Sequence, residues 1–235
     1  MNADVLVRCR AAARTYGTGP AAVVAVHGAS CEIRAGDRIA ITGPSGSGKS
    51  TLLHLLAALE TPTSGKVTWP GLAQKPGPDT VGVVFQGPSL IPALDIAENT
   101  ALPLILAGQP EPAARGRALD CLALVDAAHL ADKLPEEISG GQAQRVAVAR
   151  VLAAAPRLIL ADEPTGQLDQ DTGSRVIDVL VATADALGAG LVVTTHDPHV
   201  AGRLSRQWSM HDGRLQPVPP VPQDARPPTR QGDGQ

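Results

Sequence analysis

The sequence predicts an α/β fold with a mostly parallel sheet, a small antiparallel β layer and a helical lobe inserted between two strands. Three features indicate this fold. Several short apolar runs end abruptly in polar or glycine residues, a glycine-rich loop joins one such run to a helix, and a long helical stretch separates two of the runs. We expect residues 1–216 to form one domain, because a chain of 235 residues can bury a single sizeable core.

The parallel strands are predicted from four apolar runs: residues 38–42, 81–85, 158–161 and 191–195. Buried parallel strands are covered on both faces, so they carry continuous rather than alternating apolar residues. The first run leads into the glycine-rich loop and then into an apolar helix at residues 50–59, which Pro62 and Gly65 should end.

The antiparallel layer is expected from four short strand-like segments: residues 5–8, 23–26, 30–33 and 66–69. The helical lobe should span about residues 87–155, with a Pro-punctuated start and a helix at residues 113–128. A further helix is predicted at residues 174–187. Residues 217–235 are Pro-rich and polar without periodicity, which predicts a disordered tail.

Composition narrows the possible functions. The net charge of −3 and the pI near 6.0 provide no basic surface for a nucleic-acid backbone, so we expect no nucleic-acid partner. The N-terminus lacks the apolar core of a signal peptide. No apolar run approaches the roughly 20 residues that a membrane-spanning helix requires, so any membrane role should be peripheral. Cys9, Cys31 and Cys121 lack CxxC spacing and are expected to be free thiols in a reducing compartment.

The glycine-rich loop fits the pattern GxxxxGK[ST] and predicts a site for ATP and its Mg²⁺ ion. In such a loop, backbone N–H groups point at phosphate oxygens, and the N-terminus of the next helix adds its dipole. Lys49 should reach the β- and γ-phosphates, and the Ser50 hydroxyl should bind Mg²⁺. An ordinary glycine turn is the alternative, and the flanking strand and helix argue against it. The predicted ATP-binding residues of the loop are Gly43, Pro44, Ser45, Gly46, Ser47, Gly48, Lys49, Ser50 and Thr51.

Two adjacent acids, Asp162 and Glu163, follow the apolar run 158–161. Hydrolysis of ATP requires a carboxylate for the metal and a group that orients the attacking water. We therefore assign Asp162 to Mg²⁺ and Glu163 to the water. Acids at a strand end can instead cap the next helix, but here Pro164 follows them and the chain already carries a phosphate loop.

Gln86 and His196 follow two other predicted strands. Parallel strands deliver their C-terminal ends to one edge of the sheet, where open α/β folds bind ligands. We expect both side chains to act at the γ-phosphate, the metal or the water, with Gln86 also a Mg²⁺ ligand. A lone Gln or His is more often structural. His196 is the better candidate, because imidazole can donate a hydrogen bond to phosphate.

A second phosphate-binding end is predicted at Ser139-Gly140-Gly141-Gln142, which precedes an apolar helix at residues 146–155. Ser139 and Gln142 have the spacing of a capping box, which is the simpler explanation. Two glycines in a first helical turn, however, each cost up to about 1 kcal/mol relative to alanine. That cost suggests a backbone that approaches a ligand closely.

These motifs, in this order, resemble those of the ATP-binding subunits of ABC transporters over roughly residues 4–216. The resemblance implies an ABC-type P-loop NTPase fold and a head-to-tail homodimer that encloses two ATP molecules. In that dimer, Ser139 to Gln142 of one subunit face the phosphate loop of the other, and the segment Gly166-Gln167-Leu168-Asp169 runs across the interface. The resemblance also implies that Tyr16 stacks on adenine, and an interfacial core tyrosine is the alternative.

A narrower resemblance is to the branch that contains lipoprotein-releasing and macrolide-export ATPases. It does not identify a substrate, because in this family the membrane partner largely selects it. One departure lies between Lys66 and Val81, where the family usually has a longer stretch with a helix and basic residues. The segments that carry the narrower resemblance are Val84-Phe85-Gln86, Leu90-Ile91-Pro92-Ala93-Leu94, Glu98-Asn99, Leu102-Pro103-Leu104 and Ala161-Asp162-Glu163-Pro164-Thr165-Gly166.

The leading hypothesis is an ATPase subunit on the cytoplasmic face of the membrane that converts dimer closure on ATP into movement of a separate integral membrane permease. The apolar segment 90–106 is the candidate docking surface, and core packing of the helical lobe is the alternative. A second hypothesis is that the same dimer signals through a membrane partner to cell-envelope or division machinery. A soluble ABC ATPase acting on DNA or ribosomes is least favoured, because the chain has one ATPase module, no long coiled-coil insertion and no basic patch.

Overall fold

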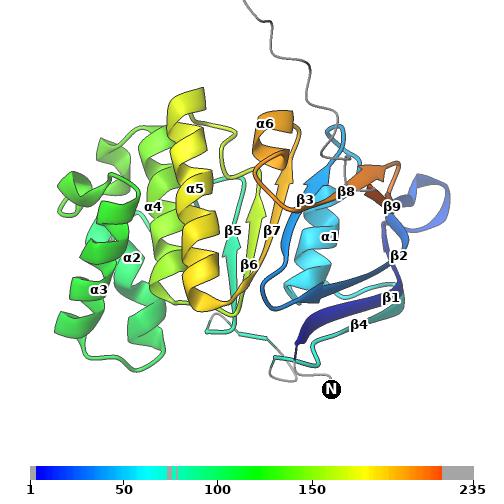
Figure 1. Ribbon diagram of the computed structural model, residues 1–235, viewed down its shortest axis with the longest axis horizontal. Coiled ribbons are helices and arrows are strands. Elements are labelled where there is room, and N and C mark those ends of the chain that lie inside the picture. Colours follow the sequence, from blue (N-terminus) through cyan, green and yellow to red (C-terminus); the bar gives the residue numbers. More distant parts are fainter. Residues whose placement is uncertain (1–3, 73–75, 78, 219–235) are drawn as a thin grey trace, which may run out of the picture.

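A computed structural model describes residues 4–72, 76–77 and 79–218, which form two sheets and a helical lobe (Figure 1). The antiparallel sheet has the strand order β2-β1-β4, and a six-stranded sheet has the order β5-β6-β7-β3-β8-β9. The strands are β1 (Val5–Tyr16), β2 (Val23–Arg34), β3 (Arg38–Thr42), β4 (Ser64–Thr68), β5 (Val81–Val84), β6 (Leu158–Asp162), β7 (Gly190–Thr195), β8 (Arg206–His211) and β9 (Arg214–Val218). The helices are α1 (Lys49–Leu56), α2 (Ile96–Leu106), α3 (Glu111–Leu124), α4 (Gly140–Ala153), α5 (Gln170–Leu187) and α6 (Pro198–Ala201), with short 3₁₀ helices η1 (Gly19–Ala21), η2 (Ala128–Leu130) and η3 (Pro135–Glu137).

The six-stranded sheet contains the four predicted parallel strands as immediate neighbours. β5 pairs with β6, β6 with β7, and β7 with β3, all in parallel register. β3 has the predicted bounds, and each of the other three differs from its prediction by one residue at one end. The predicted α/β fold with a mostly parallel sheet is therefore confirmed.

Both faces of this sheet are covered, which explains why its central strands are apolar without alternation. Every residue of β6 and β7 is buried. Leu160 and Val192 pack on one face with α1 and the antiparallel sheet, whereas Ile159 and Val193 pack on the other face with α4 and α5. Helices α1 and α4 therefore lie on opposite faces of the parallel strands (Figure 1).

The antiparallel sheet is more continuous than the sequence predicted. β1 and β2 are each 12 residues long, and the predicted pieces 23–26 and 30–33 both belong to β2. Register shifts along β1 interrupt the alternation of buried and exposed side chains, so pattern reasoning found only fragments. β4 passes close to β1 at Gly65, where a Cβ would lie 2.0 Å from the carbonyl oxygen of Ala11. In the short stretch between β4 and β5, residues 73–75 and 78 lie outside the described part of the chain.

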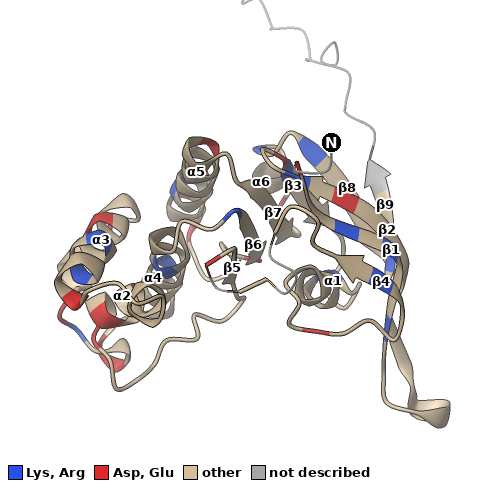
Figure 2. Ribbon diagram, turned by 90° about the horizontal axis from the view of Figure 1, so that it is seen from below, with Lys and Arg blue, Asp and Glu red and all other residues tan. Residues whose placement is uncertain are grey.

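Helices α2, α3 and α4 lie between β5 and β6 in sequence, and Figure 2 shows α2 and α3 to one side of both sheets. The sequence did not single out α2 as a helix, because Pro103 lies inside it. A proline in a helix interior costs about 3 kcal/mol. Burial of Ile96 and Leu104, together with a capping box between Asp95 and Glu98, offsets this cost.

The C-terminal hairpin of β8 and β9 was not predicted, and it changes the boundary of the tail. Trp208 and Met210 of β8 are buried, so the hairpin belongs to the core. Pro217 and Val218 pair with Trp208 and Gln207, which makes their assignment to the tail wrong. Pro217 is tolerated because β9 is an edge strand of the sheet. The rest of the predicted tail, residues 219–235, lies outside the described residues.

Two expectations from composition concern single features of the fold. The thiols of Cys9, Cys31 and Cys121 are free, as predicted, and Cys9 lies directly opposite Cys31 across β1 and β2. Within residues 4–72, 76–77 and 79–218, no helix is both long and apolar enough to cross a membrane.

Candidate functional site

The predicted site residues follow the C-terminal ends of four neighbouring strands. Thr42 at the end of β3 pairs with Thr195 of β7, and Asp162 at the end of β6 pairs with Thr194. Parallel register therefore keeps these strand ends level and brings the residues that follow them to one edge of the sheet. These residues are Gly43 after β3, Gln86 after β5, Glu163 after β6 and His196 after β7.

The glycine loop between β3 and α1 is packed against two other backbones. Gly48 has a φ of 99°, and a Cβ on it would lie 2.1 Å from the carbonyl oxygen of Ala25 in β2. On another side, the N–H of Gly213 in the β8–β9 turn donates to the carbonyl oxygen of Ser47 at 3.0 Å. Only glycine fits Gly48, because any side chain would be strained by the backbone angle and would meet β2.

Lys49 lies inside this loop, and its side chain is only 5% exposed. Its Nζ donates to the carbonyl oxygens of Gly43 at 2.8 Å and Pro44 at 3.0 Å, and lies 3.8 Å from Glu163 Oε1. The Ser47 hydroxyl is buried and has no hydrogen-bond partner among the described residues. A buried unpartnered hydroxyl and an ammonium group in the same loop are groups that a phosphate would satisfy.

Glu163 lies between Lys49 and His196. Its Oε2 is 2.9 Å from His196 Nδ1, and its side chain is 15% exposed while that of His196 is 66% exposed. The φ of Glu163 is 45°, a left-handed angle that costs an L-residue roughly 1–2 kcal/mol. Its N–H donates to the carbonyl oxygen of Thr194 at 3.1 Å. Backbone strain of this kind is typical of functional sites, and here it directs a carboxylate along the sheet edge.

Asp162 is held by Thr194, a residue that sequence reasoning missed. The Thr194 hydroxyl donates to Asp162 Oδ1 at 2.5 Å and accepts from the N–H of Glu163 at 3.1 Å. Thr194 is fully buried. One hydroxyl group thus orients both acids. Two buried threonines that end an apolar strand were the available signal, because a buried hydroxyl needs a polar partner.

The predicted Mg²⁺ ligands Ser50, Gln86 and Asp162 offer a hydroxyl, an amide and a carboxylate oxygen. Mg²⁺ prefers oxygen ligands and in nucleotide sites is held by one or two carboxylates together with phosphate oxygens. Thr194 occupies Oδ1 of Asp162 and leaves Oδ2 for a cation. Ser50 lies in the first turn of α1, and Gln86 is exposed. This donor set fits Mg²⁺. The described residues hold no group of three or more His, Cys, Asp or Glu that could bind a metal.

Ser139 and Gln142 form the capping box that their spacing predicts. The Ser139 hydroxyl accepts from the N–H of Gln142 at 3.3 Å, and Gln142 Oε1 accepts from the N–H of Ser139 at 2.8 Å. A Cβ on Gly141 would lie 3.2 Å from the backbone oxygen Gln167 O, whereas one on Gly140 would lie 2.8 Å from Oε1 of the flexible Gln167 side chain, so only Gly141 has a backbone neighbour that favours a small residue. Ser139 and Gly140 are exposed, and a phosphate contact at this turn stays a prediction.

Asp169 and Tyr16 are the two remaining predicted site residues. Asp169 caps α5 and accepts from the N–H of Thr172 at 2.9 Å. Hydrogen bonds from the backbone and the hydroxyl of Thr172 lower the pKa of the Asp169 carboxyl. Tyr16 ends β1 with 38% of its surface exposed, and the guanidinium carbon of Arg14 lies 4.7 Å from the centroid of its ring. An exposed ring at the end of a strand is suited to stacking.

A cavity of about 670 Å³ lies beside Glu163 and His196. The first turns of α5, including Asp169, and the helix α6 form its walls. None of the glycine-loop residues lines it. This cavity therefore borders the site and is separate from the loop that would hold a triphosphate.

The β8–β9 hairpin also shapes the site and was missed from the sequence. A Cβ on Gly43 would lie 2.1 Å from the carbonyl oxygen of Met210, so β8 packs directly against the start of the glycine loop. Trp208 and Met210 alternate with polar residues, which is the pattern of a half-buried strand. This pattern was the available signal, although it extends over only a few residues.

Known proteins are similar to this chain in sequence over most of its length. The family model for ABC transporters matches residues 26–166. The lipoprotein-releasing system ATP-binding protein LolD of Legionella pneumophila (strain Paris) is 39% identical over 221 residues, which are 90% of this chain and 97% of that protein. LolD of Maricaulis maris (strain MCS10) is 40% identical over 227 residues, or 93% of this chain and 99% of that protein.

A solved structure is also similar to the chain. A dimeric ATP-binding cassette in a post-hydrolysis state, bound to ADP and Pi, is 36% identical and superposes with a TM-score of 0.84 over 89% of this chain and 96% of that chain. The chain therefore belongs to the ABC transporter family, as an ATP-hydrolysing ATP-binding subunit.

Proposed function

We propose that this ATPase subunit drives a separate integral membrane permease of the lipoprotein-releasing type from the cytoplasmic face of the membrane. The names of the relatives support this choice within the family. Two lipoprotein-releasing system ATP-binding proteins are 39% and 40% identical to the chain, and each match covers at least 90% of it. A homodimer that encloses two ATP molecules is the working unit.

In the proposed site, backbone N–H groups of residues 43–51 and the N-terminus of α1 bind the phosphates. Lys49 exchanges the carbonyl oxygens of Gly43 and Pro44 for phosphate oxygens, and the Ser47 hydroxyl gains a partner. Ser50, Gln86 and Asp162 would hold Mg²⁺, which would neutralise charge on the phosphates.

The position of Glu163 is the observation that carries the hydrolytic role. Its carboxylate lies next to Lys49 on one side and His196 on the other, and its backbone is fixed by Thr194. A carboxylate in this position can accept a hydrogen bond from an attacking water and orient it toward the γ-phosphate. His196 contacts the same carboxylate through Nδ1, which must donate because a carboxylate accepts, so Nε2 can donate to phosphate only when both ring nitrogens carry a proton.

The homodimer is supported by where the two phosphate-binding ends lie. α1, which follows the glycine loop, and α4, which begins beside Ser139, pack on opposite faces of the sheet. Ser139 and Gly140 are exposed, and the cavity beside Glu163 and His196 leaves room for a neighbouring chain. In the proposed head-to-tail dimer, Ser139 to Gln142 of one subunit close over Lys49 of the other, and Asp169 lies at the interface.

The proposed docking surface for the permease is smaller than the predicted segment 90–106. Most apolar side chains of α2 are buried in the helical lobe, whereas Ile91, Ile105 and Leu106 are exposed, Leu106 to 77%. Pro103 of α2 lines a mostly apolar groove of about 270 Å³, whose walls also include Leu59. Exposed apolar surface of this kind is typical of protein–protein contacts.

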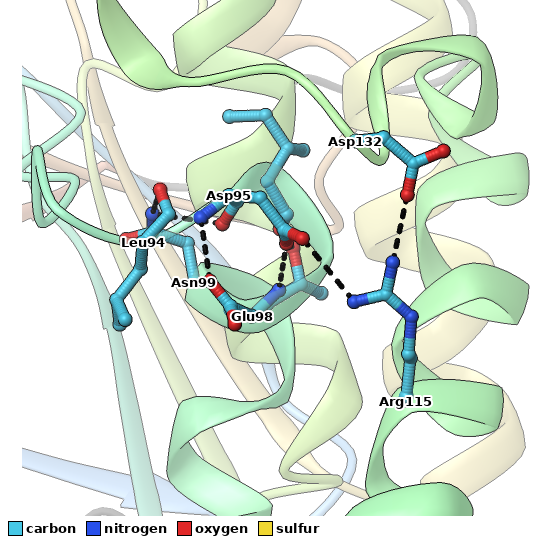
Figure 3. Close-up of polar contacts among 8 residues, drawn as sticks. Leu94, Asp95, Glu98, Asn99, Arg115 and Asp132 are labelled. Carbon is cyan, nitrogen blue, oxygen red and sulfur yellow. Dashed lines mark hydrogen bonds and ion pairs between the residues drawn. The ribbon is translucent and has the colours of Figure 1, made fainter.

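A polar network fixes the loop that precedes α2 (Figure 3). Asn99 is fully buried and accepts from the N–H of Ile91 at 2.8 Å while its amide donates to Leu94 O at 2.9 Å. Arg115 on α3 bridges Asp95 at 3.3 Å and Asp132 at 2.7 Å. These bonds preorganise the loop, so docking there would cost little conformational entropy.

Replacing Glu163 with Gln tests the hydrolytic site. Glu163→Gln keeps the side chain's size but removes the charge, so turnover should fall about a hundredfold or more while ATP still induces dimerisation. Steady-state ATPase rates and light scattering with and without ATP measure the two effects. Glu136→Gln is the matched control, since it makes the same change at an exposed position in η3. A Glu163→Gln protein with near-normal turnover would contradict the proposed site.

A further inference from the structure

Cys9 and Cys31 are direct partners across β1 and β2. The strands pair one residue for one residue here, with Arg8 opposite Glu32 and Cys9 opposite Cys31. An ion pair of 2.5 Å between Arg8 Nε and Glu32 Oε1 supports this register. Successive side chains of a strand point to opposite faces, so the two cysteines share one face of the sheet. That face is the core side, where Cys31 packs against the apolar cluster that contains Cys9.

The register gives the two cysteines the spacing that a disulfide requires. Directly opposite residues of an antiparallel pair have Cα atoms about 4.5–5.5 Å apart. Disulfides need a Cα separation of about 4.4–6.8 Å and side chains that point toward one another. A register shift follows Cys9 on β1, which gives the strands local freedom to adjust. A bond between the thiols therefore requires no rearrangement of the sheet.

The two thiols differ in their access to solvent. Cys9 lies on the central strand of its sheet and is 3% exposed, whereas Cys31 lies on the edge strand β2 and is partly exposed. Hydrogen bonding to the Cys31 thiol and burial raise the pKa of Cys9, so Cys9 stays protonated at neutral pH. The thiolate is the reactive form of cysteine. A reagent from solvent therefore meets Cys31 first.

We propose that Cys9 and Cys31 form a modification site, at which a small-molecule disulfide such as glutathione disulfide produces a reversible cross-strand disulfide. The Cys31 thiolate attacks one sulfur of glutathione disulfide and expels a glutathione thiolate. Cys9 then loses its proton, attacks Cys31 Sγ and expels the second glutathione. Two electrons pass from the cysteines to glutathione disulfide, and their two protons end on the released glutathione. Proximity within the strand pair offsets the low thiolate fraction of Cys9.

The proposed disulfide stabilises the chain without stopping hydrolysis. It joins residues 9 and 31 and so restricts the unfolded state. Gly48 of the glycine loop packs against Ala25 of β2, and this contact is kept because the strands keep their register. Oxidation at this site is therefore a protective modification of the antiparallel sheet. It is independent of the roles proposed for the ATP-site residues.

A pair of small apolar residues predicts different chemistry. Buried cysteine often serves only as a small hydrophobic side chain. In that case glutathione disulfide would leave a glutathione adduct on Cys31, and Cys9 would stay as unreactive as Cys121. Cys121 is a suitable internal standard, because it is fully buried in the other core cluster and burial raises the pKa of its thiol.

Peptide mapping of the full chain distinguishes these cases. The protein is incubated with glutathione and glutathione disulfide at graded ratios, alkylated, digested without reductant and analysed by mass spectrometry. We expect a linked pair of peptides that contain Cys9 and Cys31, which dithiothreitol separates. Cys121 should remain a thiol throughout.

Variants test the order of the two steps. Cys9→Ala should retain glutathione on Cys31, because no neighbouring thiol displaces it. Cys31→Ala should leave Cys9 unmodified, because Cys9 is buried. Cys121→Ala is the matched control and should form the linked pair as the wild type does. Mapping of the wild type requires no substitution, so it remains decisive if a variant fails to fold.

Thermal unfolding and ATPase rates test the consequence of oxidation. The linked wild type should have a Tm about 5 °C or more above that of the same sample after reduction, and kcat should differ by less than about twofold. Cys9→Ala should show no such shift in Tm. Glutathione retained on wild-type Cys31, or a disulfide that joins two chains, would overturn the proposed site. A linked pair that lowers Tm or abolishes hydrolysis would overturn its protective role.

Discussion

Thr194→Val should damage the site without touching any residue proposed to contact ATP. Valine has nearly the same shape as threonine but cannot donate a hydrogen bond. The substitution removes the bond of 2.5 Å to Asp162 Oδ1 and the acceptor for the N–H of Glu163. The Glu163 N–H keeps its second acceptor, the Thr194 carbonyl oxygen at 3.1 Å, so only the Asp162 carboxylate loses its partner.

The expected magnitude follows from the burial of both groups. Asp162 is 4% exposed and Thr194 is fully buried, so water cannot readily replace the lost bond. Removing one hydrogen bond to a buried charged group costs about 2 kcal/mol. For a domain of this size that corresponds to a decrease in Tm of about 4–8 °C. The freed carboxylate should also lower kcat roughly tenfold, because it no longer holds one orientation.

Thermal unfolding followed by circular dichroism and steady-state ATPase rates measure these two effects. Thr100→Val is the matched control, because Thr100 is also fully buried but its hydroxyl donates to Ile96 O within its own helix. That bond duplicates one already made by the helix backbone, so its loss should change Tm by less than about 2 °C. Equal losses of stability in the two variants, or an unchanged kcat in Thr194→Val, would refute the assignment of Thr194 to the acids.

Three further predictions follow from single positions. Gly48→Ala should lower Tm by more than about 8 °C, because its Cβ would meet Ala25 O. Gly28→Ala is also at positive φ but has open space around its Cβ, so it should lower Tm by only about 2–8 °C. Asp169→Asn should lower the free energy of unfolding at neutral pH, as measured by denaturant unfolding. The difference in this free energy from wild type should shrink as pH falls through the lowered pKa of Asp169, because the wild-type carboxyl then becomes neutral too. A difference that does not change with pH would contradict this. Leu106→Glu should abolish co-purification with the permease, whereas Leu124→Glu, at an exposed leucine on α3, should not; equal retention by both would remove α2 from the docking surface.

The parallel core could be predicted because each strand carries its own signal. Both faces of β6 and β7 are buried, so their residues form uninterrupted apolar runs that can be found without knowledge of their neighbours. β8 and α2 lack such a local signal. β8 contributes only Trp208 and Met210 to the core, and α2 contains Pro103, so tertiary packing and not local preference determines both elements.

Some residues of the candidate site also carry a local sequence signal, and others do not. Lys49 and Glu163 belong to contiguous motifs whose spacing reports their chemistry, and the structure brings them within 3.8 Å of each other. Thr194 acts on Asp162, a partner 32 residues away in sequence, so no motif contains both members of the pair. At Gly140 and Gly141 the motif alone was ambiguous. Their small size was attributed to a ligand, whereas the nearest groups in the described chain belong to Gln167 and Leu168.

The central claim is that Lys49 of one subunit and Ser139 of another complete one ATP site, and mixing two inactive variants tests it most directly. Lys49→Ala keeps Ser139, and Ser139→Arg keeps Lys49, so a mixed dimer contains one site with both groups intact. Random pairing makes about half of the dimers mixed, so the mixture should regain about a quarter of the wild-type ATPase rate. A mixture that contains mixed dimers yet hydrolyses ATP no faster than the two variants measured separately would contradict the shared site.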